Sequence, residues 1–280
     1  MLASKGIFAK FLYARGLDFE TVVSLRAVLA IPGFILIAML RGGLARMRGA
    51  SWSDLRGAAF AGLVCYYFGA GVNFYALTLI DASVERALLF TYPALVVIAT
   101  WFISGNRPGP GIALAVIATY VGTALTIGAF NRDLLQQNLA GAMLVLVCSA
   151  TIAYYFIVSG RLTRTMGSAA FTLVAMTVAG TALAVHYQIR HGWQNLMLDT
   201  ASFAWMIALA VFATVLPLYL VAEGVRLVGA QRAAISSTVG PPATAVMAIL
   251  LLGETVSASQ LAGIALIVGS ILALEMRRSD

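Results

Sequence analysis

The chain has 280 residues, of which 61% are hydrophobic and 10% are charged. A soluble domain carries about 25% charged residues, so this chain cannot cover itself with a hydrated surface, and its surroundings must be mostly hydrocarbon. The net charge of +7 comes from basic residues scattered singly between apolar runs, which excludes the basic stripe of a nucleic-acid-binding protein.

The apolar runs predict membrane-spanning helices. A helix needs about 20 apolar residues to cross about 30 Å of hydrocarbon, and its backbone groups must be satisfied within the segment. The first run, Ala3–Ala14, reaches only roughly 18 Å at about 1.5 Å per residue. It is either a partial helix or the end of a helix that begins before this sequence, and we count it as the first helix. We expect an all-α membrane protein of about ten helices, the others near Thr21–Leu40, Gly57–Ile80, Ala82–Ser104, Gly111–Phe130, Leu139–Ser159, Ala169–Ile189, Ala201–Ala222, Ala233–Leu252 and Val256–Leu274.

The arginines predict the orientation. Cytoplasmic connections of membrane proteins are enriched in Lys and Arg. If the N-terminus is cytoplasmic, Arg15, Arg132 and Arg190 lie outside, and a larger set lies inside: Arg41, Arg46, Arg48, Arg56, Arg107, Arg161, Arg164, Arg226, Arg232, Arg277 and Arg278. The sequence therefore predicts a multi-pass protein of the cell (inner) membrane with both termini in the cytoplasm.

The two halves of the chain share a spaced pattern. Leu79, Ala82, Pro93 and Gly105 recur 148 positions later as Leu227, Ala230, Pro241 and Gly253. In each half an apolar helix with an interior proline leads to a glycine turn and one more span. Five spans in each half would give the second half an inverted topology, and inverted repeats place a substrate site near the midplane.

This pattern resembles a known family. The features that carry the resemblance are the interior prolines, Gly253-Glu254, the last helix with Gly263 and Gly269, and an opening with Lys10, Gly16-Leu17-Asp18 and Arg26. Together they resemble two copies of the EamA domain of the drug/metabolite transporter superfamily, at residues 1–130 and 139–275. The resemblance implies ten helices in two inverted five-helix repeats and export of small metabolites, often amino acids. The chain is similar to exporters of aromatic and neutral amino acids. The first copy has Asn106 where the second has Glu254, which leaves the role of Glu254 open.

Polar side chains deep in apolar helices are candidates for the substrate cavity. Tyr92 lies roughly 16 Å along its helix from Asp81, and it directly precedes Pro93, which frees a backbone carbonyl. We expect Tyr75 and Tyr92 to line a midplane cavity, although hydrogen bonding between helices is the alternative for each polar residue. The other cavity candidates are Asn73, Tyr154, Tyr219 and Ser237, and the expected helix breaks are at Pro93, Pro217 and Pro241.

Charged residues in or beside the spans are candidates for gating. An ionisable group at the bilayer centre costs at least about 2.5 kcal/mol, so each needs an explanation. The candidates are Arg26, Glu85, Arg86, Glu223 and Arg232. Arg26 could instead reach the interface or pair with Asp18 or Glu20, Glu85 could stabilise a solvated helix start, and Glu223 could pair with Arg226. In the gating hypothesis the corner after Ile80 closes the outer mouth and the corner after Ala222 closes the inner one.

These features favour a secondary transporter that works by alternating access, without enzyme activity, cofactor or metal. Its expected partners are a small-molecule substrate and the lipid bilayer. The sequence leaves the oligomeric state open between a monomer and a homodimer. The alternatives are an intramembrane lipid-modifying enzyme, a lipid or polyprenyl flippase, and a channel. The first would need a nucleophile or metal constellation facing a cavity. Cys65 and Cys148 lie in apolar runs away from His and Asp, and we expect two free, buried thiols.

Overall fold

The computed structural model describes residues 4–104, 110–126, 132–192, 198–230, 233–234 and 240–276, and the regular elements in these ranges are all helical. This confirms the expected all-α fold. The elements are α1 (Lys5–Ala14), α2 (Phe19–Leu40), α3 (Gly43–Arg48), α4 (Trp52–Gly62), η2 (Leu63–Gly69), α5 (Ala70–Leu79), α6 (Ala82–Leu89), α7 (Tyr92–Ser104), α8 (Pro110–Thr126), α9 (Arg132–Met166), α10 (Ser168–His191), α11 (Thr200–Ala210), η4 (Val211–Val215), α12 (Leu216–Val228), α14 (Gly240–Leu252) and α15 (Ala258–Met276).

Six helical stretches of the described chain are long and apolar enough to cross a membrane. They are Phe19–Leu40, Trp52–Leu79, Ala82–Ile103, Gln136–Met166, Ser168–His191 and Thr200–Val228. Shorter apolar helices cover Ile117–Thr126 and Ala258–Ser270. The length and composition of the helices therefore support a multi-pass membrane protein, and the count of ten spans stays a prediction.

The boundaries of several helices follow from local chemistry. Asp18 accepts a hydrogen bond from the Thr21 backbone N–H at 2.7 Å and so caps the start of α2. The expected end of the span Leu139–Ser159 is wrong, because α9 continues through Gly160 to Met166. The turn to α10 instead uses Gly167, whose φ of 80° is a conformation that a residue with a Cβ adopts only with strain.

Irregular helical segments interrupt three of the spans. A π-helical segment, η2, joins α4 to α5, and a second one, η4, joins α11 to α12. Val211, which begins η4, lies 148 positions after Leu63, which begins η2. Between α6 and α7 the helix breaks at Phe90 and Thr91. The three predicted break residues, Pro93, Pro217 and Pro241, are each the second residue of an assigned element. Pro93 follows the break between α6 and α7, where the missing N–H costs no intrahelical hydrogen bond. Pro217 instead directly follows η4 inside the continuous helical stretch Thr200–Val228.

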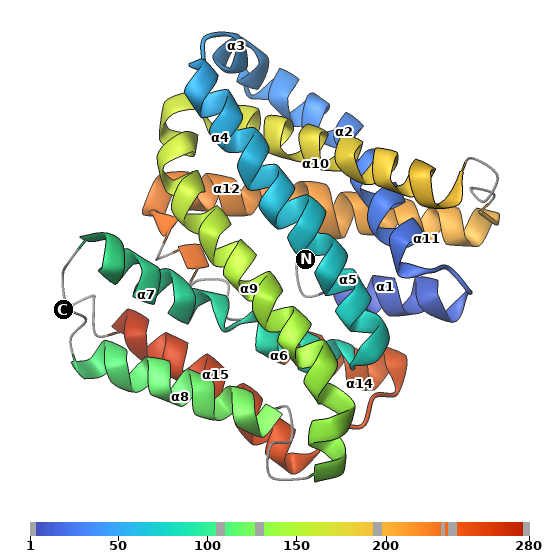
Figure 1. Ribbon diagram of the computed structural model, residues 1–280, viewed down its shortest axis with the longest axis vertical. Coiled ribbons are helices and arrows are strands. Elements are labelled where there is room, and N and C mark those ends of the chain that lie inside the picture. Colours follow the sequence, from blue (N-terminus) through green and yellow to red (C-terminus); the bar gives the residue numbers. More distant parts are fainter. Residues whose placement is uncertain are drawn as a thin grey trace.

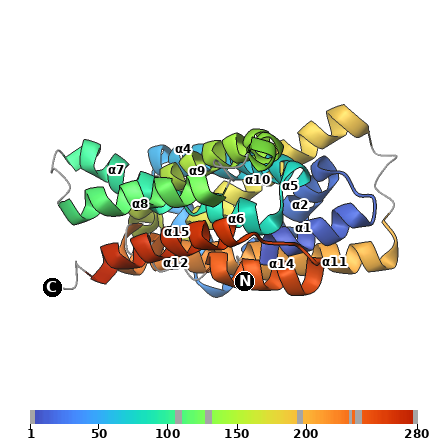
Figure 2. The same ribbon diagram turned by 90° about the horizontal axis from the view of Figure 1, so that it is seen from below.

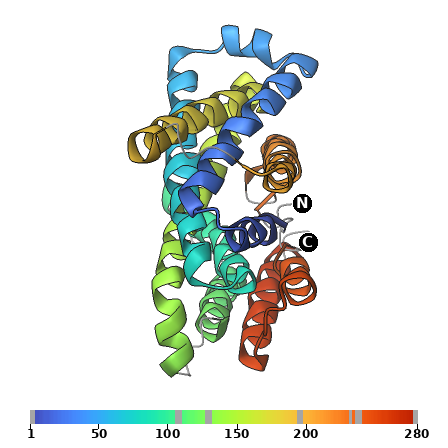
Figure 3. The ribbon, with the colours of Figure 1, turned by 90° about the vertical axis from the view of Figure 1, so that its right-hand side faces the viewer.

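The helices form a flat molecule in which helices from the two halves of the chain pack together. Figure 1 shows α2 beside α10 at one end of the molecule and α8 beside α15 at the other, and these pairs are in contact. The long helix α9 connects the two ends. Figure 2 shows α9, α4 and α10 in one layer and α11, α12 and α14 in another, with α6 between them. In the side view of Figure 3, the blue helices that follow α1 extend to the end opposite the red C-terminal helices, while α1 lies in the middle and contacts α14.

Glycines allow some of these helices to meet backbone to backbone. A Cβ at Gly62 would lie 2.1 Å from the carbonyl oxygen of Ala175 in α10, and one at Gly122 in α8 would lie 2.8 Å from that of Gly263 in α15. Such contacts are typical of membrane helix interfaces, where small residues replace the hydrophobic effect as the source of close packing. Other helices expose large apolar side chains on the outside: Leu40 in α2, Phe102 in α7 and Leu250 in α14 are all more than 70% exposed. This surface suits a lipid environment.

Candidate functional site

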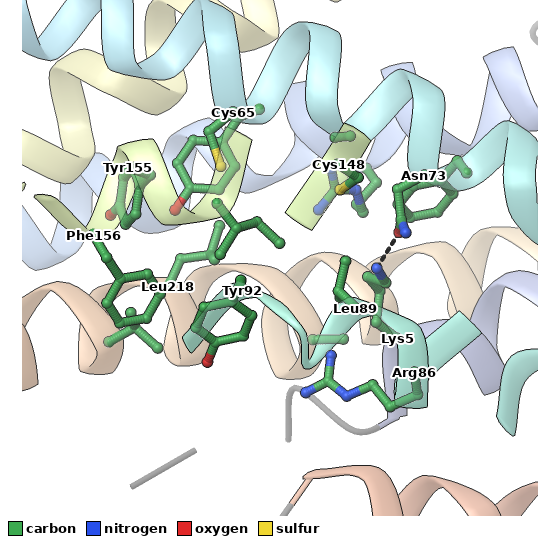
Figure 4. Close-up of a pocket in the computed structure, with 17 residues that line it drawn as sticks. Lys5, Cys65, Asn73, Arg86, Leu89, Tyr92, Cys148, Tyr155, Phe156 and Leu218 are labelled. Atoms are coloured by element: carbon green, nitrogen blue, oxygen red, sulfur yellow. Dashed lines mark hydrogen bonds between the residues drawn. The ribbon is translucent and has the colours of Figure 1, made fainter. Parts of the chain in front are cut away.

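A buried cavity of about 110 Å³ lies at the centre of the molecule, where helices from both halves of the chain meet. The first half contributes α1, α2, η2, α5, α6 and α7, and the second half contributes α9, η4 and α12. Its lining residues are Lys5, Arg26, Cys65, Tyr66, Ala70, Asn73, Phe74, Arg86, Leu89, Tyr92, Cys148, Ile152, Tyr155, Phe156, Ala213, Leu218 and Val221. Figure 4 shows that the cavity has two chemically different ends.

The irregular segments face this cavity. Cys65 and Tyr66 belong to the π-helical segment η2, and Ala213 belongs to η4. Leu89 and Tyr92 stand on either side of the break between α6 and α7. A π-helical turn or a break leaves backbone groups with altered hydrogen bonding, and in membranes such backbone is tolerated where it is buried in protein or lines a cavity. The two π-helical segments and the break between α6 and α7 therefore form part of the cavity wall.

One end of the cavity holds a buried ion pair. The Lys5 Nζ lies 3.2 Å from a carboxylate oxygen of Glu85, whose side chain is 1% exposed. The Asn73 side-chain amide donates to the same carboxylate at 2.7 Å, and Lys5 also donates to the Asn73 carbonyl oxygen. Figure 4 shows Lys5 and Asn73 close together at this end. Three helices, α1, α5 and α6, are thereby connected by one polar network.

Two arginines complete the polar end, and neither has a carboxylate partner among the described residues. Arg26 donates to the Thr214 hydroxyl at 3.1 Å, and its guanidinium lies 4.9 Å from the centre of the Phe74 ring. The Nε and one terminal nitrogen of Arg26, and the Nε of Arg86, are buried without a hydrogen-bond partner in the described chain. Arg86 stacks over the Phe90 ring at 4.9 Å. Stacking on aromatic rings positions both cations without neutralising them.

The other end of the cavity is aromatic. The rings of Tyr92 and Phe156 stack at 5.1 Å, and those of Tyr66 and Tyr155 meet edge to face at 5.0 Å. The Tyr92 hydroxyl donates to the backbone carbonyl of Ala234 at 3.4 Å. In Figure 4, Tyr92, Tyr155 and Phe156 lie opposite Lys5, Asn73 and Arg86. The cavity therefore has hydrogen-bond donors at one end and an aromatic wall at the other.

The structure brings some of the predicted residues to this cavity and not others. Asn73, Tyr92, Arg26 and Arg86 line it, and Glu85 bonds to two of its lining residues. Arg86 therefore lies in the cavity wall, and Glu85 is buried beside it and not at a solvated corner. The buried, free state of both cysteines agrees with the sequence analysis.

Several other predicted residues lie elsewhere. Tyr75 is 43% exposed and packs on Phe19 at 5.0 Å, so the expectation that it lines the midplane cavity is not met here. Tyr154 faces the Phe60 ring, while Tyr219 is buried in α12 outside the lining.

The remaining gating candidates are only partly described. Glu223 pairs with Arg226 along one face of α12, with the Arg226 Nε 2.9 Å from the carboxylate, as its alternative interpretation expected. Ser237 and Arg232 lie outside the described residues. The inner corner of the gating hypothesis is therefore untested by the structure.

Sequence reasoning missed Lys5, Tyr155 and Phe156 as cavity residues. A usable signal existed for Lys5, because a lysine inside an apolar run too short to span alone calls for a buried partner. No comparable signal distinguished Tyr155 from its neighbour Tyr154. Adjacent residues on a helix point in directions about 100° apart, and only the packing shows which of them faces inward.

The apolar helices, several of them interrupted by non-α segments around a central cavity, are those of a polytopic membrane protein. A family model described as the EamA-like transporter family matches the chain twice, at residues 1–128 and 139–276. The chain belongs to this family.

Known relatives agree with this assignment, and a solved structure shares the fold. The chain is 32% identical over 280 residues to the uncharacterized transporter YcbK of Bacillus subtilis (strain 168), covering 99% of this chain and 89% of that protein. It is 24% identical to the uncharacterized inner membrane transporter YicL of Salmonella typhimurium, over 72% of this chain and 67% of that one. A crystal structure with 17% identity has a TM-score of 0.70, covering 100% of this chain and 99% of that chain, and shows a shared fold.

Proposed function

We propose that the chain is a secondary transporter that exports small metabolites, in particular aromatic and neutral amino acids, across the cell (inner) membrane by alternating access. The observation that carries the proposal is the buried cavity between elements of both halves, with polar groups at one end and aromatic rings at the other. Membership of a transporter family supports transport in general. The choice of amino acids rests on the pairing of charged and aromatic groups, which matches an amino acid with an apolar side chain.

Alternating access in this proposal uses two inverted repeats, residues 1–130 and 139–275. Two observations support them. The two π-helical segments begin 148 positions apart, at Leu63 and Val211, the same offset that relates Pro93 to Pro241. The equivalent helices α2 and α10 pack together, as do α8 and α15. A site at the junction of two repeats can be opened to either side when one half rocks against the other.

The proposed orientation places both termini in the cytoplasm. Its support is the excess of arginines in alternate connections, which the positive-inside rule assigns to the cytoplasmic side. We expect a reporter that works only outside the cytoplasm to be silent when it is fused after Asp280. An active reporter at that position would show that the C-terminus lies outside the cytoplasm. It would also contradict the placement of the corner between α5 and α6 on the outer side of the membrane.

Transport is tested most directly with purified protein in liposomes. Vesicles that contain the protein should accumulate one or more labelled amino acids from a panel faster than empty vesicles do. The flippase alternative predicts movement of labelled lipid between leaflets, and the enzyme alternative predicts a chemically altered lipid in the same vesicles. If no amino acid moves and lipid does, the proposed substrate class is wrong and the flippase is favoured.

Tyr92→Ala should weaken transport by about tenfold in apparent affinity, equivalent to about 1.4 kcal/mol. The substitution removes a ring that stacks on Phe156 within the cavity, and aromatic pairs contribute about 0.5–1.5 kcal/mol beyond their buried area. Tyr75→Ala is the matched control, because this tyrosine lies outside the cavity. The measurement is the concentration dependence of initial uptake, with protein insertion checked by quantitative blotting. Equal effects of both substitutions would place the solute elsewhere.

A further inference from the structure

We propose, resting on the transport function above, that the cavity selects solutes with a carboxylate or a similar planar anion, and that Arg26 and Arg86 bind this group. The solute's apolar or aromatic part would lie against Tyr92 and Phe156. Cations and amines that lack an anionic group would be excluded.

The balance of charge at the polar end is the first argument. Lys5, Arg26 and Arg86 line the cavity, while the carboxylate found there among the described residues belongs to Glu85. That carboxylate already accepts hydrogen bonds from Lys5 and Asn73. The three basic groups therefore outnumber the carboxylate of Glu85 at this end of the cavity, so the described site carries a net positive charge and an entering cation would be repelled.

The unsatisfied donors are the second argument. Arg26 is 4% exposed and Arg86 is 5% exposed, so water does not reach them as it reaches a surface arginine. Three of their nitrogen atoms lack a hydrogen-bond partner among the described residues. Buried ionised groups are normally paired, since an isolated charge in a medium of low dielectric constant is strongly disfavoured. The planar guanidinium matches the geometry of a carboxylate with two parallel hydrogen bonds.

The position of these donors is the third argument. The Arg26 guanidinium lies over the ring of Phe74 in α5 and donates a hydrogen bond to the Thr214 hydroxyl in η4. Its orientation is therefore set by both halves of the chain. Figure 4 shows Arg86 at the polar end and Tyr92 towards the aromatic end of the same cavity. An anion bound at the arginines would therefore place an attached apolar group beside the aromatic rings.

Three probes of matched shape separate the charges: 3-phenylpropanoate is an anion, 2-phenylethylamine is a cation, and phenylalanine carries both charges. The readout is the protection of the chain's two cysteines, Cys65 and Cys148, which both line the cavity. Purified protein in detergent is treated with N-ethylmaleimide, and the extent of labelling is followed by intact mass. We expect 3-phenylpropanoate and phenylalanine to slow labelling and 2-phenylethylamine to leave its rate unchanged.

Arginine variants test the assignment of the two residues. Arg26→Gln and Arg86→Gln should each raise the concentration of 3-phenylpropanoate needed for protection by at least about tenfold, because a hydrogen bond to a charged group is lost. Arg86→Lys keeps the charge but not the paired donors, and it should fall between Arg86→Gln and the unaltered protein. Arg15→Gln is the control, since Arg15 pairs with Asp199 at an exposed position away from the cavity. Thermal unfolding checks that each variant is folded.

The outcomes separate this inference from the transport proposal. Protection by 2-phenylethylamine as strong as that by 3-phenylpropanoate would overturn the anion assignment, as would equal protection in the unaltered protein and both glutamine variants. Absence of protection by all three probes, with labelling proceeding normally, would also overturn it. The transport proposal depends on amino-acid flux in vesicles and would survive any of these results if flux is observed.

Discussion

Replacing Glu85 by alanine is expected to lower the free energy of unfolding by about 3–5 kcal/mol. The Glu85 side chain is buried and pairs with Lys5 at 3.2 Å, so its removal leaves a buried ammonium group without its counter-ion. The Asn73 amide loses its acceptor as well. Two nearby guanidinium groups make the effect larger, because Glu85 offsets part of their charge. The measurement is thermal or denaturant-induced unfolding of the purified protein in detergent micelles.

Two further variants isolate the cause. Glu223→Ala breaks a pair whose side chains are 26% and 35% exposed, and it should cost less than about 1 kcal/mol. The double variant Lys5→Met with Glu85→Gln removes both charges and keeps an acceptor for Asn73. It should recover most of the stability lost in Glu85→Ala, since replacing a buried ion pair as a unit is often neutral. A loss in Glu85→Ala no larger than that in Glu223→Ala would show that the buried network does not stabilise the fold.

The length of an apolar run predicted the simple spans well. The expected span Thr21–Leu40 is the helix Phe19–Leu40, and the expected span Ala169–Ile189 is the helix Ser168–His191. These helices start and end where polar caps and glycines interrupt the run, which are features that a sequence displays. The extension of α9 through Gly160 was missed, because glycine in a helix costs only about 1 kcal/mol and tertiary packing can offset that.

The candidate site was only partly predictable, for a physical reason. Hydropathy identified polar residues in apolar helices and so found Asn73 and Tyr92. It could not tell which residues face inward, because a membrane helix is apolar on its lipid-facing side and its protein-facing side alike. Tyr75 and Tyr154 were therefore selected with the same argument as Tyr92, although the packing places them away from the cavity. Only the arrangement of neighbouring helices determines that outcome.

The structure also gives Glu254 a role that the comparison of the two copies left open. Its carboxylate accepts hydrogen bonds from the backbone N–H groups of Ala82 at 2.8 Å and Ser83 at 3.2 Å, and from the Ser83 hydroxyl at 2.7 Å. Glu254 thus caps the first turn of α6 from the other half of the chain, where the helix dipole favours a negative charge. Burial and the nearby Glu254 carboxylate raise the pKa of Asp81 at the same corner.

This contact makes the corner between α5 and α6 the proposed outer gate, and a cross-link across it should stop transport almost completely. In the proposed topology the corner and Glu254 both face outside, and each belongs to a different half. Asp81→Cys and Glu254→Cys, made in a background without Cys65 and Cys148, can be bridged by a short, reducible bis-methanethiosulfonate reagent. Because alternating access requires the halves to separate at this side, the bridged protein should lose uptake and regain it after reduction.

The controls separate the bridge from the substitutions. Each single cysteine variant, treated with the same reagent, should keep the uptake rate that it has before treatment, since it carries the modification without the covalent link. Asp81 makes no side-chain capping bond to α6, so its replacement removes no contact that the helix start depends on. The extent of bridging is read by intact mass in the sample used for uptake. If bridging is complete and uptake continues at the untreated rate, the two halves do not part at this corner, and opening must occur by movement elsewhere between them.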